Sequence, residues 1–464
     1  MTDKQNALVF KAFERALRVI RTRVSVSAAP PGIAIAYSGG LDSSALLHLA
    51  HVYAATHGIK LYAFHIHHGL SPNADDWLAH CHEECARLGV TFDARHVNLA
   101  GKDKSGVEEA ARISRYAALG ELCRAHRTPL LLTAHHQDDQ AETVLLQLLR
   151  GSGVAGMSGM DEANTAFDLL GDCKLLMGRP LLAVSRAALD EFVISEAIPY
   201  IEDESNMDPR YARNALRHKV MPALAEYFPG FQQRFARTAA HAQSAQRLLV
   251  ELAAQDLASC LDGDCLDIKQ IRRLSSDRID NLLRYWFGTR GVRMPSTSWL
   301  SEMRTQLLEA KADAQLCVTH ADCHIRRHRD RVFITPKFET DIEDLEPQVF
   351  RWNGETAMRF AAFGGVLYFE SAEQGVEADW LRGRDLCISL RSGGERLKLA
   401  LNRPTKSLKY HYQAFDVPAW ERERLPLVTS ANHLLFAAGI GMDCHHLGST
   451  PGLHIRFRWQ PDHV

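Results

Sequence analysis

The stretch IAIAYSGGLDSSALLHLA at residues 33–50 constrains the fold of this chain more than any other part of it. An apolar, β-type segment runs directly into Ser-Gly-Gly and then into a helix-patterned stretch that begins with an acid and two hydroxyl residues. A strand that feeds a helix through a glycine turn presents unpaired N–H groups and the positive end of the helix dipole at one point. Phosphate is the usual occupant of such a site. The stretch therefore predicts a strand–turn–helix unit that binds an anion.

The turn offers both backbone and side-chain donors. Its candidate anion-binding residues are Ser38, Gly39, Gly40, Leu41, Asp42 and Ser43. The two glycines let the backbone turn sharply and approach an oxyanion without an intervening Cβ atom. Asp42 is repelled by phosphate unless a cation such as magnesium, or a substrate ammonium group, lies between them. No lysine follows the glycines as in a Walker A loop, so transfer of a γ-phosphoryl group is disfavoured.

The first part of the chain alternates β-type runs with helical patterns. Strands are expected at 33–37, 61–67, 91–97 and 130–134, and helices at 43–55, 74–88, 107–126 and 139–150. Ser105 and Glu108 form a capping box for the third of these helices. This alternation predicts a doubly wound α/β domain with a parallel sheet. Long helical runs follow at 231–257, 277–287 and 298–310, and short strands after residue 332. We expect an α/β domain over 1–222, a helical middle domain over 223–335 and a small mixed α+β C-terminal domain over 336–464.

Length and composition indicate a multidomain, reduced protein. A chain of 464 residues with 46% hydrophobic content is too long for one core. No apolar run approaches the ~18 residues that a membrane span needs, and charged residues interrupt the N-terminal helical pattern, so we expect no membrane association and a cytoplasmic location. The ten cysteines are dispersed and lack a Cys-x-x-Cys pair. The segment CVTHADCHIRRH at 317–328 fits a strand with a basic face better than a zinc site, and we assign it no metal.

The charge is nearly balanced overall but unevenly distributed. The net charge of −2 argues mildly against a nucleic-acid partner. Two segments, however, contain several basic residues and no acid, namely 210–219 and 396–409. In the first, Arg210, Arg213 and Arg217 recur at helical spacing and predict a cationic stripe suited to phosphates. The basic residues of the second are Arg396, Lys398, Arg403, Lys406 and Lys409. Tyr410 and Tyr412 either stack on unpaired bases or belong to the core.

A second polar constellation, TAHHQDDQAETVLLQLLRGSG, occupies residues 133–153. It leaves a strand and enters a helix, so its polar side chains should lie at the carboxyl edge of the sheet beside the Ser-Gly-Gly turn. His135, Asp139 and Glu142 recur at i, i+4 and i+7, which predicts one shared helical face. The helix dipole accounts for Asp138. The dinucleotide-like GSGVAG at 151–156 follows a helix rather than a strand, and we interpret it as a flexible loop.

These motifs resemble a known family. The 38–43 turn resembles the pyrophosphate-binding loop of the N-type ATP pyrophosphatases, which split ATP between its α- and β-phosphates to adenylate a substrate. HIHHGL at 65–70, VEEAARISRY at 107–116, HHQDDQAET at 135–143 and EDESNMDPRYARNALR at 202–217 narrow the resemblance to the tRNA(Ile)-lysidine synthetases. LLRYWFGTRGVRMPS at 282–296, and RSGGERLKL and PAWERERLPLV within 391–428, are similar to the helical and C-terminal tRNA-binding domains of that family.

The resemblance implies a two-step reaction. ATP adenylates the C2 oxygen of the cytidine at the first anticodon position of an isoleucine tRNA, and free lysine then displaces AMP through its ε-amine. It implies ATP binding by the turn residues together with His65, Arg112 and His135, and catalysis by Asp42, Asp139 and Glu142, with Asp42 or Asp139 as magnesium ligand. Arg115, Arg213, Arg217 and the 396–409 basic residues would bind lysine or tRNA. Arg112 and Arg115 either reach the α-phosphate or the base, or serve an ordinary Glu108–Arg112 ion pair.

Three other functions compete with this one. A tRNA thiolase with the same loop needs cysteines for sulfur transfer or an iron–sulfur cluster, and the missing Cys-x-x-Cys disfavours it. An amidotransferase needs a glutaminase domain, and none is visible before the loop. A non-catalytic tRNA-binding protein is disfavoured by the complete set of polar site residues. A homodimer is compatible with the sequence.

Overall fold

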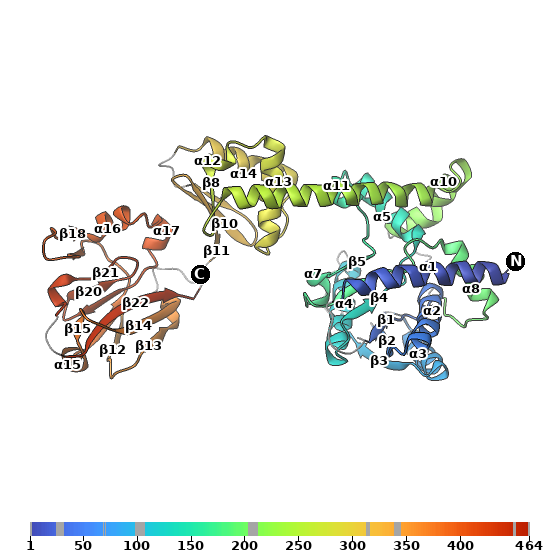
Figure 1. Ribbon diagram of the computed structural model, residues 1–464, viewed down its shortest axis with the longest axis horizontal. Helices are drawn as coiled ribbons and strands as arrows, with labels where there is room; N and C mark the ends of the chain where they lie inside the picture. Colours follow the sequence, from blue (N-terminus) through green and yellow to red (C-terminus); the bar gives the residue numbers. More distant parts are fainter. Residues whose placement is uncertain are drawn as a thin grey trace. The chain divides into compact units, whose positions relative to one another are not determined.

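The computed structural model describes residues 2–24, 32–67, 69, 71–97, 107–202, 212–311, 316–337, 345–448 and 452–462. Two compact units divide the chain, Met1–Leu252 and Ala253–Val464. Figure 1 shows helices around a sheet in the first unit and mostly strands in the second. The predicted capping box of Ser105 and Glu108 and the predicted stripe residue Arg210 involve side chains outside the described residues. The predicted domain limits at 222 and 335 stay predictions.

A six-stranded sheet of order β3-β2-β1-β4-β6-β5 forms the centre of the first unit. Its strands are β1 Ile33–Ala36, β2 Leu61–His67, β3 Thr91–His96, β4 Leu130–Leu132, β5 Ala163–Asn164 and β6 Leu176–Gly178. All neighbours pair in parallel except β5, which runs antiparallel to β6. The predicted doubly wound α/β fold is confirmed.

Helices cover both faces of this sheet. The side chains of β1 point alternately to the two faces, and they pack against the helices on each side. Ile33 and Ile35 point into a core shared with α1 Thr2–Thr22, α2 Leu41–His57, α3 Ala74–Leu88 and α8 Arg186–Ser195. Ala34 points into the opposite core, which α4 Val107–Ala125 and α7 Phe167–Leu170 complete. The side chains of β1 are therefore buried on both faces of the sheet.

The strand order places a topological switch point at β1. This strand has β2 on one side and β4 on the other, so the chain leaves its carboxyl end toward two opposite halves of the sheet. Open α/β sheets bind ligands at this crevice. The turn at 38–40 follows β1, and the turn before α5 Gln137–Leu149 follows β4.

The first unit continues with an irregular helical segment. It comprises α9 Ala212–Ala215, the π-helical turn η2 Leu216–Val220, α10 Met221–Tyr227 and the start of α11 Phe231–Cys260. One earlier expectation is wrong here: the 151–156 segment is not simply a loop, because it enters the short helix α6 Val154–Met157 with Gly153 as its N-cap. This helix packs on α5.

The second unit begins with helices packed on an antiparallel sheet of order β7-β8-β11-β10-β9. Its elements are β7 Leu261–Asp262, β8 Cys265–Asp267, α12 Ile268–Ile271, α13 Ser276–Thr289, α14 Thr297–Glu309, β9 Cys317–Thr319, β10 Cys323–His328 and β11 Arg331–Pro336. The helical middle region is confirmed. The 317–328 segment forms two antiparallel strands rather than one. Its face is only partly basic, because Arg327 is buried.

The C-terminal part contains two antiparallel sheets that enclose one core. The strands are β12 Gln348–Phe350, β13 Ala357–Phe360, β14 Gly365–Ala372, β15 Val376–Glu377, β16 Leu386–Ser389, β19 Leu427–Ser430, β20 His433–Ala437, β21 Gly441–Met442 and β22 His454–Pro461. The hairpin β17 Arg396–Leu397 and β18 Lys406–Ser407 forms a further two-stranded sheet. Helical elements are η4 Ala361–Phe363, α15 Ala378–Arg382, α16 Leu408–Ala414, α17 Ala419–Arg422 and η5 Cys444–His446. The predicted mixed α+β composition is confirmed.

Candidate active site

The Ser-Gly-Gly turn requires glycine at its centre. Gly39 has φ +85°, and a Cβ atom there would lie 2.7 Å from Ile201 Cδ1 and 2.9 Å from Cys81 Sγ. The Ile201 N–H donates to the Gly39 carbonyl over 2.9 Å and fixes the turn from outside. Gly40 is the N-cap of α2. Because the first-turn N–H groups of a helix lack acceptors within that helix, the turn is suited to an anion.

The hydroxyl groups near the turn stabilise its shape. Ser43 Oγ donates to the Gly40 carbonyl over 2.9 Å and lies 3.1 Å from Ser38 Oγ. Ser44 Oγ donates to the Gly39 carbonyl over 3.2 Å. Ser43 and Ser44 are buried, whereas Ser38 is exposed. Ser38 is thus the hydroxyl most accessible to a ligand.

Asp42 lies at the start of α2 with its two carboxylate oxygens in different surroundings. Oδ2 accepts a hydrogen bond from Arg186 Nη1 over 2.7 Å. Oδ1 is buried and accepts no hydrogen bond, and its distance to His136 Nε2 is 3.7 Å. Burial raises the pKa of Asp42, against the opposing fields of His136 and Arg186. A buried carboxylate oxygen without a partner fits a hard cation such as magnesium.

Asp139 and Glu142 lie on one face of α5 and bind two arginines. Arg213 donates from Nε to Glu142 Oε2 over 2.8 Å and from Nη2 to Asp139 Oδ1 over 3.0 Å. Arg217 donates from Nε to Glu142 Oε1 over 2.7 Å, and from Nη2 to Glu142 Oε2 over 2.9 Å and Asp139 Oδ1 over 3.2 Å. The side chain of Glu142 is only 2% exposed. The two described arginines of the predicted phosphate stripe, Arg213 and Arg217, are therefore paired with carboxylates.

The helical face predicted for His135, Asp139 and Glu142 is correct for the two acids only. The helix α5 begins at Gln137, and His136 is its N-cap in an extended conformation. The Asp139 N–H donates to His136 Nδ1 over 3.4 Å, and the His136 N–H donates to Asp139 Oδ2 over 3.0 Å. This reciprocal cap fixes the N-terminus of α5 at His136, so His135 lies outside the helix. Burial raises the pKa of Asp139, but the nearby histidines, Arg213 and the His136 N–H outweigh burial and lower it.

His135 lies just outside the helix and within reach of the same charges. Its Nδ1 is 2.9 Å from Thr133 Oγ1. Burial lowers the pKa of His135 far below its ordinary value, and the fields of Arg179, Arg213 and Arg115 lower it further. Its imidazole is therefore neutral at physiological pH and suited to hydrogen bonding rather than to carrying charge.

Three other predicted ATP- or substrate-binding residues border this region. His65 on β2 is buried, and its Nδ1 lies 3.0 Å from the carbonyl oxygen of Tyr37, the residue that follows β1. Arg112 and Arg115 on α4 are exposed and flank the ring of Tyr116 at 5.7 and 5.4 Å. The alternative pairing of Arg112 with Glu108 involves a side chain outside the described residues.

Sequence reasoning missed two residues of the site, Arg186 and His136. Arg186 begins α8, binds Asp42, and also donates from Nε to Asp190 Oδ1 over 3.0 Å. Its backbone N–H donates to Asp138 Oδ2 over 2.8 Å, so Asp138 has a partner beyond the helix dipole. Nothing in the sequence near Arg186 marks it, whereas the doubled histidine before QDD was a usable signal for His136.

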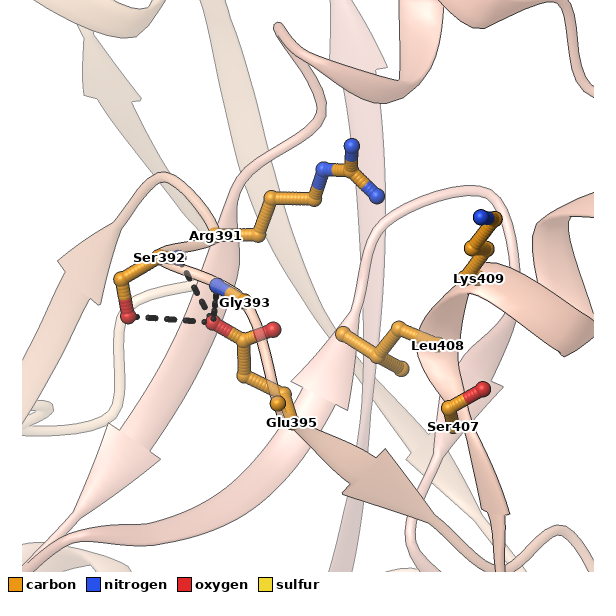
Figure 2. A pocket seen from close by; sticks show the side chains of 8 residues that line it. Arg391, Ser392, Gly393, Glu395, Ser407, Leu408 and Lys409 are labelled. Atoms are coloured by element: carbon orange, nitrogen blue, oxygen red, sulfur yellow. Dashed lines mark hydrogen bonds between the residues drawn. The ribbon is translucent and has the colours of Figure 1, made fainter.

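The second unit contains the predicted basic residues. Arg396 donates to the Thr405 carbonyl over 2.9 Å, and the Lys406 ammonium lies 5.2 Å from the ring centre of Tyr410. Within the described residues, Lys398, Arg403, Lys406 and Lys409 form no ion pair. Tyr412 is fully buried and belongs to the core, whereas Tyr410 is half exposed. Lys409 lines a cavity together with Arg391 (Figure 2).

Across the described part of the chain, no helix combines the length and apolarity of a membrane span.

Comparison with known proteins gives a consistent result over most of the chain. Three family models match: the PP-loop domain over residues 12–224, the TilS substrate binding domain over 266–333 and the TilS substrate C-terminal domain over 386–459. The tRNA(Ile)-lysidine synthase of Ralstonia nicotianae is 39% identical over 445 residues and covers 94% of each chain. That of Burkholderia pseudomallei is 40% identical and covers 95% of this chain and 96% of its own. That of Coxiella burnetii is 34% identical and covers 92% of each.

Proposed function

The chain belongs to the tRNA(Ile)-lysidine synthase family, and from this membership we propose that it joins free lysine to C2 of the wobble cytidine of an isoleucine tRNA. The reaction consumes ATP and releases pyrophosphate and AMP. One observation carries the assignment of the chemistry to this site: Asp42, Asp139 and Glu142 converge beside the anion-binding turn at the switch point of the sheet.

In the first step the C2 oxygen of cytidine attacks the α-phosphorus of ATP, and the bond to the β-phosphate oxygen breaks. The leaving pyrophosphate gains negative charge. Backbone N–H groups at the start of α2 and the Ser38 hydroxyl are placed to stabilise that charge without reorganisation. Neutral His135, with Arg115 nearby, is suited to orient the phosphate or the ribose.

Magnesium fits Asp42 better than Asp139. Asp42 Oδ1 is buried without a hydrogen-bond partner, whereas both oxygens of Asp139 already accept hydrogen bonds. When bound, magnesium would offset the repulsion between the Asp42 carboxylate and the phosphates. Arg186 holds the other oxygen of Asp42 and so fixes its orientation.

In the second step the ε-amine of lysine attacks C2, and the C2–O bond to AMP breaks. An ammonium group with a pKa of ~10.4 must first lose a proton. Asp139 and Glu142 are the proposed binding site for this cation, and a carboxylate of the site accepts the proton. All four of their oxygens are hydrogen-bonded, to Arg213, Arg217 and the His136 N–H. Lysine must therefore displace guanidinium contacts, which releases an arginine toward the lysine carboxylate or the adenylate phosphate.

Holding the tRNA requires a surface beyond this site. The unpaired basic residues of 396–409 and the middle domain are proposed to bind tRNA.

Nucleoside mass analysis tests the proposal directly. Isoleucine tRNA with a wobble cytidine is incubated with the protein, ATP and lysine, and the expected result is a lysine-dependent mass gain at that cytidine. Pyrophosphate release should require both tRNA and ATP, and AMP release should accelerate when lysine is added. A tRNA carrying uridine at the wobble position is the control, and no mass gain with the cytidine tRNA would contradict the proposal.

A further inference from the structure

The C-terminal part of the chain contains a cavity that the proposed reaction does not use. Its volume is about 310 Å³. It lies between the loop Arg391–Glu395 and the start of α16, with Arg391, Glu395, Ser407, Leu408 and Lys409 among its lining residues (Figure 2). The loop and the helix are tied together, because the Leu408 N–H donates to the Glu395 carbonyl over 3.0 Å and β17 pairs with β18. The walls of the cavity are therefore preformed.

The loop wraps around the carboxylate of Glu395. Three donors converge on Glu395 Oε1: the Ser392 N–H at 2.6 Å, the Gly393 N–H at 2.8 Å and Ser392 Oγ at 3.2 Å. The two glycines that follow Ser392 have φ of +99° and +91°, a conformation that favours glycine. Arg391 immediately precedes this turn, so the Glu395 carboxylate fixes the point from which the Arg391 side chain extends.

Two cations of the cavity have no acidic partner. Among the described residues, neither the Arg391 guanidinium nor the Lys409 ammonium takes part in an ion pair. In Figure 2 the Arg391 side chain extends across the cavity toward the side where Lys409 lies. Several exposed arginines elsewhere in this unit are paired, for example Arg359 with Asp462 at 3.2 Å and Arg382 with Asp379 at 2.7 Å. The cavity thus carries two cations and one carboxylate, and one oxygen of that carboxylate already accepts three hydrogen bonds from the loop.

We propose that this cavity binds one phosphodiester of the tRNA, held between Arg391 and Lys409, and that Glu395 is a positioning residue that holds the loop for Arg391. The proposal rests on the proposed function, since it takes tRNA as the substrate. A phosphodiester has a single negative charge, which matches the net charge of +1 from the three side chains. A terminal phosphate or a nucleotide has more charge and suits the cavity less well.

The proposal predicts the direction in which removal of the Glu395 carboxylate changes the affinity for tRNA. Electrostatics alone predicts that removal of this acid strengthens RNA binding. If Glu395 positions Arg391, Glu395→Ala weakens binding instead, and Glu395→Gln, whose amide oxygen accepts the same hydrogen bonds, restores most of the affinity. The double variant Arg391→Ala/Glu395→Ala should bind no more weakly than Arg391→Ala alone.

The experiment measures the dissociation constant of full-length isoleucine tRNA for the intact protein over a range of salt concentrations. Arg391→Ala and Lys409→Ala should each raise it about five- to tenfold and lower the slope of log K against log salt by roughly 0.7–0.9. Arg359→Ala, which removes an exposed but ion-paired arginine of the same unit, should change neither. Thermal unfolding of each variant checks its folding, and Arg391→Lys, which keeps the charge, should retain the salt slope.

Tight binding by Glu395→Ala, or an unchanged salt slope in Arg391→Ala, would overturn the proposal. Inorganic phosphate and ATP test the other sources of anion. If either stabilises the protein against heat in an Arg391-dependent way while tRNA binding ignores Arg391, the assignment to RNA is wrong. A wild-type protein that binds tRNA but does not modify it would contradict the proposed reaction alone.

Discussion

Among single residues, Asp42 lowers the stability of the native state, although we propose it as a residue of the catalytic site. Its pKa is raised above 3.8 chiefly by burial, so its ionised form is less stable in the native state than in the unfolded state. The cost is absent below about pH 3.8, where both states are protonated, and grows as the pH rises through the higher native pKa. We expect Asp42→Asn to raise Tm at pH 7 by about 2 °C, corresponding to roughly 1 kcal/mol. The gain should vanish near pH 3.

The same variant should lose activity. Asparagine lacks the charge that a magnesium ion at Asp42 Oδ1 requires, so pyrophosphate release should fall by about 100-fold or more. Asp190→Asn is the matched control, since Asp190 binds the same Arg186 but lies on the exposed side of it. Differential scanning calorimetry and a pyrophosphate assay measure the two effects. Full activity in Asp42→Asn would remove Asp42 from the mechanism.

Arg217 tests whether the two arginines compete with the incoming ammonium group. Arg217→Ala frees acceptor positions on Glu142, so 1,5-diaminopentane, an amine without a carboxylate, should inhibit the variant at about three- to tenfold lower concentration than the wild type. The apparent affinity for lysine should increase less, because the variant has lost a partner for the lysine carboxylate. Steady-state AMP release with lysine as varied substrate gives the inhibition constant of the diamine and the KM for lysine. Weaker inhibition by the diamine would show that Arg217 does not compete for Glu142.

The candidate site could be predicted from the sequence only where it consists of short motifs. Asp42, Asp139 and Glu142 lie in motifs that follow strands, and the switch point brings them together. Arg186 is 144 residues from Asp42, and no local pattern at the start of α8 marks its pairing. The role of His136 was missed for a different reason: periodicity does not show that a reciprocal cap, rather than the helix itself, begins there.

At the scale of elements, segments with a strong local pattern were predicted well. The expected strand at 61–67 and helix at 74–88 have the same bounds as β2 and α3, because a mostly apolar run defines the strand and an amphipathic stripe defines the helix. The strands β5 and β6 were not predicted. They contain only 2 and 3 residues, and their pairing with each other and with β4 depends on tertiary context that no short sequence pattern contains.

The buried Arg327 of β10 satisfies backbone carbonyl groups at the end of a neighbouring helix, α14. It extends from β10 and donates from Nη1 to the Leu307 and Ala310 carbonyls over 2.8 and 2.7 Å, which satisfies the end of α14. Arg327→Met should cost about 2–4 kcal/mol, because it leaves buried carbonyl groups unpaired. Urea denaturation measures the loss. Arg273→Met, at an exposed position on the same unit, should change the stability by less than about 0.5 kcal/mol, and an equal loss in the two variants would contradict the capping role.

At the scale of the whole molecule, the distribution of charge matters more than its sum. A net charge of −2 gives no general attraction to RNA. Many described arginines outside the 396–409 segment form ion pairs with acids, as the pairs of Arg278 with Asp256 and Arg293 with Asp322 illustrate. Attraction to tRNA should therefore depend on cations that have no acidic partner, and it should weaken when such cations are removed.

Arg403, Lys406 and Lys409 are exposed or half-exposed cations of this kind. Replacing all three by alanine should weaken tRNA binding roughly 30-fold near physiological salt and reduce the slope of log K against log salt by about 2–3, one counterion for each phosphate contact. The matched control replaces Arg359, Arg382 and Arg458 by alanine. This removes the same charge, but these three arginines are paired with Asp462, Asp379 and Glu370. ATP affinity measured without tRNA should be unchanged in both variants, because the nucleotide site belongs to the other unit. Equal losses of tRNA affinity in the two triple variants would mean that net charge, and not the unpaired cations, governs association.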